Sequence, residues 1–189
     1  KAVGPFSLSI NDESGLLVEG FNSPPALMMN YAKKWYEKGL RRKGYQKAMD
    51  LLAYDMDIHQ GMSAKTEKMA AKAFQIDGLT ERPLNPKNME EDLRIILDIY
   101  NDAWAENWGF VKMTPPEVSY MAKSMKPLLV PELARIIEIN GKPAAMIVAL
   151  PDMNEAIKDL NGQVLPFGWA KLLWRLKIQG LSRARVMLM

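Results

Sequence analysis

The sequence predicts a mixed α/β fold, and three of its patterns support this. Apolar residues recur at helical spacing from Met89 to Trp104. Two apolar runs, 133–139 and 143–150, flank Asn140-Gly141, the dipeptide favoured in a tight hairpin turn whose two central residues have positive φ. The chain has 189 residues, 48% of them apolar and 25% charged, which is typical of a globular protein. This length suffices for one full domain or two incomplete ones.

The first sixty residues carry short and interrupted patterns. Residues 6–10 alternate between apolar residues and serine, which predicts a half-buried strand. A helical pattern from Tyr31 ends at Gly44, where a left-handed backbone commonly closes a helix. We expect residues 47–56 to form another strand. The apolar side of the helix is formed by Ala32, Trp35, Tyr36 and Leu40.

A change in composition after residue 60 indicates a domain boundary. Residues 59–63 have the character of a linker, and residues 64–74 have the composition of a helix. The sequence therefore predicts three parts: a first unit (1–60), a linker with its helix (61–75) and a second unit (76–189).

The second unit carries the stronger signals. After a short strand and loop (76–83), either Asn85-Pro86 or Asn88 can cap the helix that reaches Trp104, and Asn88 has Glu91 at the spacing of a capping box. Thr114 and Glu117 have the same spacing before a helix that ends by Pro127. Beyond the hairpin, the patterns predict helices at 154–160 and 170–177 and a last strand at 183–189, with 186–189 buried on both faces.

Composition narrows the classes of function. The formal net charge of +3 is too small to indicate nucleic-acid binding. Without cysteine, and with His59 as the only histidine, a thiolate nucleophile and a multi-histidine metal site are excluded. No apolar run approaches the roughly 20 residues that span a bilayer. We expect a cytoplasmic protein without a metal, nucleic-acid or membrane partner.

Few residues suggest chemistry by themselves. The segment Asn101–Thr114 packs two tryptophans and a Gly-Phe pair into fourteen residues, which can line a pocket but more often seals a core. Asp55 or Asp57 could pair with His59 on one strand face, although a solvated strand end explains them as well. Tyr31 and Tyr36 could donate protons, and helix packing explains both equally.

Three groups of residues resemble the Gcn5-related N-acetyltransferase (GNAT) superfamily. Trp35-Tyr36, Gly44-Tyr45 and the following residues to Tyr54 resemble the closing helix and strand of that fold. The tryptophan block 101–110 and the segment 165–174 resemble a bacterial branch with two such domains in tandem. The chain would then be a fragment, the tail of one domain joined to the head of the next.

The resemblance implies a central mixed sheet flanked by helices, and the transfer of an acyl group from acetyl-coenzyme A or another acyl-coenzyme A to a small-molecule or peptide amine. Leu40 stands where many family members have a tyrosine acid, so no catalytic residue is assigned, and neither unit carries a phosphate-binding loop. Coenzyme A should therefore bind weakly. Open strand edges should favour association of chains into a homo-oligomer. The alternative is a GNAT-fold binding protein without catalysis.

The resemblance also assigns two sets of site residues. The donor strand is formed by Val186, Met187, Leu188 and Met189. The acceptor pocket is formed by Trp104, Asn107, Trp108 and Phe110.

Overall fold

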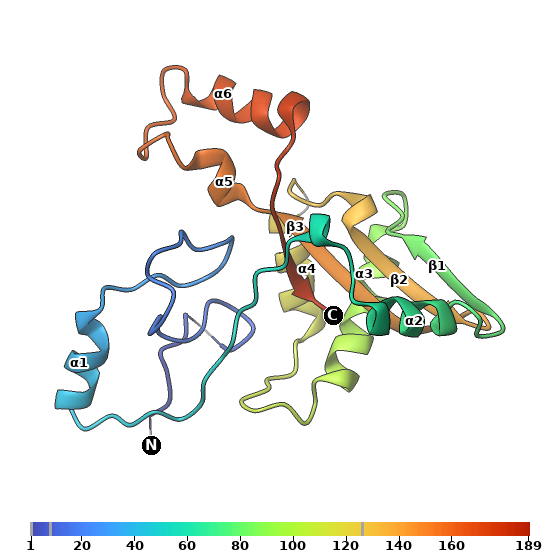
Figure 1. Cartoon of the computed structure of the whole chain (residues 1–189), viewed down its shortest axis with the longest axis horizontal. Coiled ribbons are helices and arrows are strands. Elements are labelled where there is room, and N and C mark those ends of the chain that lie inside the picture. Colours follow the sequence, from blue (N-terminus) through green and yellow to red (C-terminus); the bar gives the residue numbers. More distant parts are fainter. Residues whose placement is uncertain (1, 8, 126) are drawn as a thin grey trace.

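A four-stranded antiparallel sheet organises the C-terminal part of the chain in the computed structural model, which describes residues 2–7, 9–125 and 127–189. Its strands lie in the order β1-β2-β3-β4 (Figure 1). Every described pair is antiparallel, so the expected mixed sheet is wrong for this part of the chain. The strands are β1 (Leu79–Pro83), β2 (Ala134–Ile139), β3 (Lys142–Pro151) and β4 (Ala184–Leu188).

The described residues form six α-helices, of which α3 packs against β3 of the sheet and α4 packs against α3. Short 3₁₀ turns occupy Ile58–Gln60 and Pro131–Leu133, and a π-helical turn, η3 (Arg175–Gln179), extends α6. The α-helices are α1 (Trp35–Arg42), α2 (Ala64–Ala73), α3 (Met89–Ala103), α4 (Pro115–Met125), α5 (Met153–Ile157) and α6 (Gly168–Trp174).

The core lies where α3 covers β2 and β3. The apolar spacing of α3 turns one face inward, as predicted, because residues three and four apart share a helix face. Burying this face against β-branched and other apolar side chains is the main stabilising contribution here. The buried members are Leu84, Ile96, Leu97, Tyr100, Met113, Ala134, Ile136, Met146 and Val148.

The hairpin between β2 and β3 confirms the turn that Asn140-Gly141 predicts. Both residues have positive φ, 52° and 73°. The backbone N–H of Asn140 donates to the carbonyl of Gly78 at 2.9 Å, which ties the turn to the residue before β1. Gly78 has a positive φ of 73°, and a Cβ there would lie 2.1 Å from Asn140 Oδ1, so both the backbone angle and the close approach favour glycine.

The starts of α3 and α4 are fixed by carboxylates. Asn88 makes no side-chain capping bond, so the capping box expected there is wrong. The buried carboxylate of Asp92 instead accepts from the backbone N–H of Asn85 at 2.6 Å. At α4, Glu117 accepts from both the N–H and the hydroxyl of Thr114, at 2.8 and 2.7 Å. The reciprocal reach of Glu117 is therefore confirmed, while the Thr114 hydroxyl acts as a donor to it.

Asp92 also anchors an ion cluster under the edge of the sheet. Arg82 on β1 pairs with Asp92 at 2.8 Å and with Glu138 on β2 at 2.9 Å. Hydrogen bonding to Glu138 raises the pKa of Arg82 despite partial burial. The cluster joins α3 to two strands and satisfies a buried charge.

Residues 2–63 form much less regular structure than expected. The strand predicted at 6–10 is reduced to one bridge between Phe6 and Ser14, and position 8 lies outside the described residues. Residues 47–56 form no strand and are exposed, because no described strand pairs with them. Alternation alone cannot form a strand, since the ladder needs a partner. Helix α1 fully buries none of its residues: on its expected apolar side Trp35 and Tyr36 are exposed, and Leu40 is partly buried.

The last strand and the helices before it also differ from expectation. β4 pairs only with β3 and lies at the edge of the described sheet, and Val186 is 51% exposed. The prediction that 186–189 is buried on both faces is therefore wrong. Between β3 and β4, residues 153–181 form a hairpin of α5 and α6 that extends away from the sheet (Figure 1, orange to red). Leu173 and Trp174 are exposed on it.

Candidate functional site

Three aromatic rings meet at the C-terminal end of α3. Tyr100 is buried and lies 5.6 Å from the ring centre of Trp104 and 5.7 Å from that of Phe110, both in tilted geometry. Trp104 and Phe110 are partly buried against the core cluster. We call these three residues the aromatic corner. Tilted ring pairs of this kind fix the relative positions of helix and loop.

The loop that carries Phe110 is held by one amide side chain. Asn101 Oδ1 accepts from the backbone N–H of Met113 at 3.0 Å, and Asn101 Nδ2 donates to the carbonyl of Met113 at 3.1 Å. An amide can serve one donor and one acceptor of the same residue, as a neighbouring strand would. This double contact closes the segment 104–113 into a loop on the end of α3.

A segment from the start of the chain covers the aromatic corner. The Tyr100 hydroxyl donates to Asn11 Oδ1 at 2.6 Å, and Asn11 Nδ2 donates to the carbonyl of Val111 at 2.9 Å. A Cβ on Gly109 would lie 3.1 Å from Ile10 Cδ1. Burial raises the pKa of the Tyr100 hydroxyl, which therefore stays protonated at neutral pH and acts as the donor to Asn11.

The aromatic corner contacts the end of the expected donor strand. Trp104 Nε1 donates to the backbone carbonyl of Met189 at 3.4 Å. β4 carries a bulge at this end: Val186 is opposite Ala149 and Leu188 is opposite Val148, so Met187 is the extra residue. A bulge bends a strand and removes a residue from the ladder, which re-aims backbone groups beside it.

The structure brings together part of each expected site set. Trp104 and Phe110 meet around Tyr100, and Trp104 joins Met189. Asn107 and Trp108 are exposed, and in the described part of the chain neither side chain makes a ring contact or hydrogen bond with the aromatic corner. Met187 and Leu188 are partly buried, whereas Val186 and Met189 are exposed.

A second polar cluster lies at the other end of the β3–β4 pair. Asp152 is only 3% exposed and accepts from the N–H of Leu27 at 2.9 Å and from the N–H of Asn154 at 3.2 Å. Asn154 Nδ2 donates to the carbonyl of Pro25 at 2.8 Å, and Arg185 donates to the carbonyl of Leu27. Burial lowers the pKa of the Arg185 guanidinium, while Asp152 and Glu13 oppose that shift.

Sequence reasoning did not find this second cluster. Asp152 follows a strand and precedes Asn154, a spacing that indicates a helix cap, and it does cap α5. It accepts a hydrogen bond from Leu27, which lies 125 positions earlier in the sequence, and no local sequence pattern can indicate a contact between residues so far apart. Residues 9–30 are therefore held beside β4 at two points, one at Asn11 and the other at this cluster.

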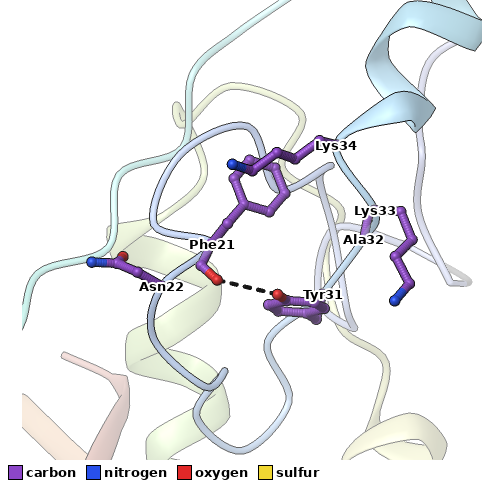
Figure 2. A pocket seen from close by; sticks show the side chains of 6 residues that line it. All are labelled: Phe21, Asn22, Tyr31, Ala32, Lys33 and Lys34. Carbon is purple, nitrogen blue, oxygen red and sulfur yellow. Dashed lines mark hydrogen bonds between the residues drawn. The ribbon is translucent and has the colours of Figure 1, made fainter.

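A shallow hollow of about 250 Å³ lies elsewhere, beside α1. The edge of the Phe21 ring faces Tyr31 at 6.4 Å, and the Tyr31 hydroxyl donates to the carbonyl of Phe21 at 3.2 Å (Figure 2). The Lys34 ammonium lies 5.2 Å over the Phe21 ring. The hydroxyl proton of Tyr31 is thus engaged by the backbone. The lining residues are Phe21, Asn22, Tyr31, Ala32, Lys33 and Lys34.

The acidic residues near His59 have structural contacts. Asp57 accepts from the backbone N–H of His59 at 3.0 Å and caps a 3₁₀ turn, and Asp55 pairs with Arg183 at 3.1 Å. Tyr36 stacks on Trp35, with ring centres 4.2 Å apart. The carboxylate of Asp57 therefore meets the backbone of His59 instead of forming the acid–imidazole pair that was considered.

The described ranges (2–7, 9–125 and 127–189) contain no group of three or more acidic, histidine or cysteine side chains placed to hold a metal ion. None of their helices combines the length and the apolar character that crossing a bilayer requires.

Comparison with known proteins gives two relatives of high similarity. No family model matches the sequence, and no solved structure matches it. Protein YghO of Escherichia coli K12 is 44% identical over 194 residues, which cover 100% of this chain and 48% of that protein. The chain spans about half the length of the curated relatives it matches. The chain is 43% identical to the bacterial ceramide synthase of Caulobacter vibrioides over 188 residues, which cover 100% of this chain and 49% of that protein.

Proposed function

We propose that this chain belongs to an N-acyltransferase that moves an acyl group from acyl-coenzyme A to the amino group of a long-chain amino alcohol. A ceramide is the amide of a fatty acid with such an amino alcohol. The similarity to a bacterial ceramide synthase therefore supports both the bond that is formed and the class of acceptor. Coenzyme A is the proposed carrier of the acyl group.

The order of elements supports the GNAT fold as the framework. A strand, two helices, a hairpin of two strands and a further edge strand follow each other from β1 to β4. The antiparallel order β1-β2-β3-β4 leaves one side of β4 without a strand partner among the described residues. A free strand edge at β4 fits the donor strand that the resemblance assigns to residues 186–189, although the antiparallel order differs from the mixed sheet that it implies.

The donor is proposed to lie along this free side of β4. An acyl-coenzyme A carries amide groups in its arm, and such groups can pair with a strand edge as an added strand would. At the bulge around Met187, backbone N–H groups leave the ladder and can donate to the thioester oxygen as it becomes negatively charged. This placement agrees with the donor set Val186, Met187, Leu188 and Met189.

The acceptor is proposed to enter beside the aromatic corner. The amine must be neutral to attack the thioester carbon, and a partly dry aromatic surface disfavours its charged form. Attack forms the C–N bond and breaks the C–S bond. The thiol of coenzyme A leaves, and the amine loses one proton. Trp104 and Phe110 would exclude water and contact the acceptor without transferring protons.

The hydrogen bond from Trp104 Nε1 to the Met189 carbonyl is the observation that carries this arrangement. It places the aromatic corner against the end of the proposed donor strand, so donor and acceptor would meet there. A GNAT-fold binding protein without catalysis remains the second candidate. Leu40 at the position of the familiar tyrosine acid favours it for the first unit.

The test is an acyl-transfer assay with the natural polypeptide that contains these residues. A long-chain acyl-coenzyme A and sphinganine are the substrates, and mass spectrometry follows the amide. Released coenzyme A can be titrated with a thiol reagent, after subtraction of a blank that contains the polypeptide without acyl-coenzyme A. Trp104→Leu should lower the rate at least about tenfold, whereas Trp35→Leu, at an exposed position on α1 outside the proposed site, should keep it. Coenzyme A binding without amide formation would favour the binding protein.

A further inference from the structure

The positive charge of the molecule is concentrated around α1. Residues 33–47 contain seven basic residues and one acidic residue, a net charge of +6. The whole chain carries +3, so the remainder, +3 less +6, sums to −3. Figure 1 shows α1 at the edge of the molecule, away from the sheet. All seven basic residues are exposed, and we call them the basic surface: Lys33, Lys34, Lys38, Arg41, Arg42, Lys43 and Lys47.

The helical spacing gives α1 one basic side. Lys34, at the N-cap of α1, is followed by Lys38 and Arg41 at intervals of four and three residues, which places all three on one side of the helix. By the same spacing Leu40 lies on the opposite side, and it is partly buried. The basic side chains therefore face outward from a regular helix.

Nearby acidic residues neutralise only part of this charge. Arg41 pairs with Glu37 at 2.7 Å, and Lys47 pairs with Asp50 at 2.8 Å. Both pairs are exposed, and exposed ion pairs contribute little to stability. Within the described part of the chain, the other five basic residues have no carboxylate at ion-pair distance.

The helix dipole accounts for the basic residues at only one end of α1. Arg41 and Arg42 lie in the last turn, where the exposed carbonyls favour cations. Lys33 and Lys34 lie before the first turn, where the same dipole repels a cation. Lys34 and Lys38 also repel each other, because like charges four residues apart are neighbours on a helix. Helix stability therefore does not account for charges at both ends, whereas a bound anionic surface would.

The spread of the basic surface indicates an extended anionic partner rather than a single phosphate. Helix α1 alone is about 12 Å long, and basic residues precede and follow it. The shallow hollow beside it includes only Lys33 and Lys34 of the basic surface, and the Lys34 ammonium lies over the Phe21 ring. A small anion in that hollow would leave the other five basic residues without a partner.

Exposed apolar residues close to the basic surface distinguish a bilayer from a nucleic acid. Leu52 and Tyr54 are 73% and 85% exposed. One residue spans at most about 3.6 Å, so Leu52 lies within about 18 Å of Lys47. The phosphates of a nucleic acid would account for the basic residues but not for the apolar ones. An anionic bilayer accounts for both, because its headgroups attract basic side chains and its interface accepts apolar ones.

We infer that the basic surface docks on an anionic phospholipid bilayer, with Leu52 and Tyr54 in the headgroup region. The negative potential of such a bilayer attracts the basic surface and repels the remainder of the chain, whose net charge is −3. Both effects turn α1 toward the bilayer.

Docking at the surface differs from the absence of a membrane partner that the sequence suggested. That expectation rested on the lack of an apolar run long enough to span a bilayer, and surface binding needs no such run. The inference also goes beyond the proposed function. Vesicle binding involves no acyl transfer, and acyl transfer can be measured on dispersed substrates, so either can fail without the other.

The test is co-sedimentation of the natural polypeptide that contains these residues with vesicles of phosphatidylcholine, with or without phosphatidylglycerol. Binding should need phosphatidylglycerol and should weaken at high salt. Lys38→Gln with Arg42→Gln should lower the partition constant at least about tenfold, because two charges leave the basic surface. The matched control is Lys68→Gln with Lys72→Gln on α2, which removes the same charge at the same spacing from two exposed residues elsewhere.

A second pair of substitutions tests the apolar contact. Leu52→Ser with Tyr54→Ser should lower the partition constant about fivefold or more. The matched control is Leu165→Ser with Phe167→Ser, whose side chains are 78% and 77% exposed and are also two residues apart. Far-ultraviolet circular dichroism should change little in each of these variants, because every replaced side chain is exposed.

Three results would overturn the inference: no binding of the unmodified polypeptide to anionic vesicles, binding that high salt leaves unchanged, or equal losses in a variant pair and its control. Fluorescence anisotropy with a labelled single-stranded DNA examines the competing partner. DNA binding without vesicle binding would also overturn the inference and would identify a nucleic-acid surface instead.

Discussion

Trp104 and Met189 are joined across 85 residues by a hydrogen bond of 3.4 Å from the indole Nε1 to the backbone carbonyl. The contact fastens the last residue of the chain to the end of α3. Trp104→Phe keeps an aromatic ring and removes the N–H, so it should cost about 1 kcal/mol of unfolding free energy. Urea denaturation measures this cost. Trp108→Phe, on the exposed side of the loop, should change the free energy by less than about 0.5 kcal/mol, and equal losses would argue against the bond.

The loop of the aromatic corner should depend on one amide. Asn101→Ala leaves the N–H and carbonyl of the buried residue Met113 without their partner, which should cost about 2–3 kcal/mol. The near-ultraviolet circular dichroism of the aromatic residues should weaken at the same time. Asn107→Ala makes the same substitution at an exposed site in the same loop. If both variants unfold at the same urea concentration, the two hydrogen bonds between Asn101 and Met113 contribute little to stability.

The ion cluster of Arg82, Asp92 and Glu138 should stabilise the fold far more than an exposed ion pair does. Arg82→Ala leaves Asp92 buried without its cation, and because Arg82 is itself about one-third exposed we expect a loss of about 2–3 kcal/mol. Arg94→Ala removes an exposed pair with Glu91 on the same helix and should cost less than about 1 kcal/mol. Thermal unfolding of the two variants compares them directly. A smaller loss for Arg82→Ala would contradict the role given to Asp92.

Alanine substitutions at two glycines with similar φ angles distinguish the cost of backbone strain from the cost of a close contact. Gly78 and Gly20 have φ of 73° and 82°, so alanine should cost each about 1–2 kcal/mol. Only at Gly78 would the new Cβ meet another group, at 2.1 Å from Asn140 Oδ1. Gly78→Ala should therefore be the more destabilising by about 1 kcal/mol or more. Equal denaturation midpoints would mean that Asn140 simply moves aside.

Glu117 should give α4 a pH-dependent contribution. The hydroxyl of Thr114, and then its backbone N–H, lower the pKa of this carboxyl. A carboxyl with a lowered pKa in the folded state stabilises above its unfolded pKa of about 4.3 and loses that contribution as the pH falls through the folded value. The stability difference between the natural chain and Glu117→Gln should therefore be constant near neutral pH and shrink below about pH 4. A difference that does not vary with pH would contradict the bond.

The sequence predicted the parts of the fold that local chemistry determines. The hairpin at Asn140-Gly141, helix α3 and the reach of Glu117 back to Thr114 all follow from spacing and residue type, and all are found. Prediction failed where the outcome depends on a distant partner. Residues 47–56 and 186–189 both have strand-like composition, and only the second has a strand beside it.

The site was predictable to a similar degree. The tryptophan block was singled out from its composition, and Trp104 and Phe110 each contact Tyr100 at the end of α3. Tyr100, at the centre of the corner, lies within the helical pattern from Met89 to Trp104 and was not singled out. Its contact with Asn11 spans 89 residues, so no pattern within one segment could indicate it. Asp152 and Arg185 were missed for the same reason. The assignment of donor and acceptor residues stays a prediction.

The contact of Leu27 with Asp152 and Arg185 has a consequence for biosynthesis. Arg185 is added to the growing chain 158 residues after Leu27. The segment around Leu27 can therefore take its native place only when nearly all of these residues have left the ribosome. Such long sequence separations slow folding, because the ends of a large loop must find each other first. We expect residues 9–30 to be among the last to become protected, and meanwhile to depend on chaperones in the cell.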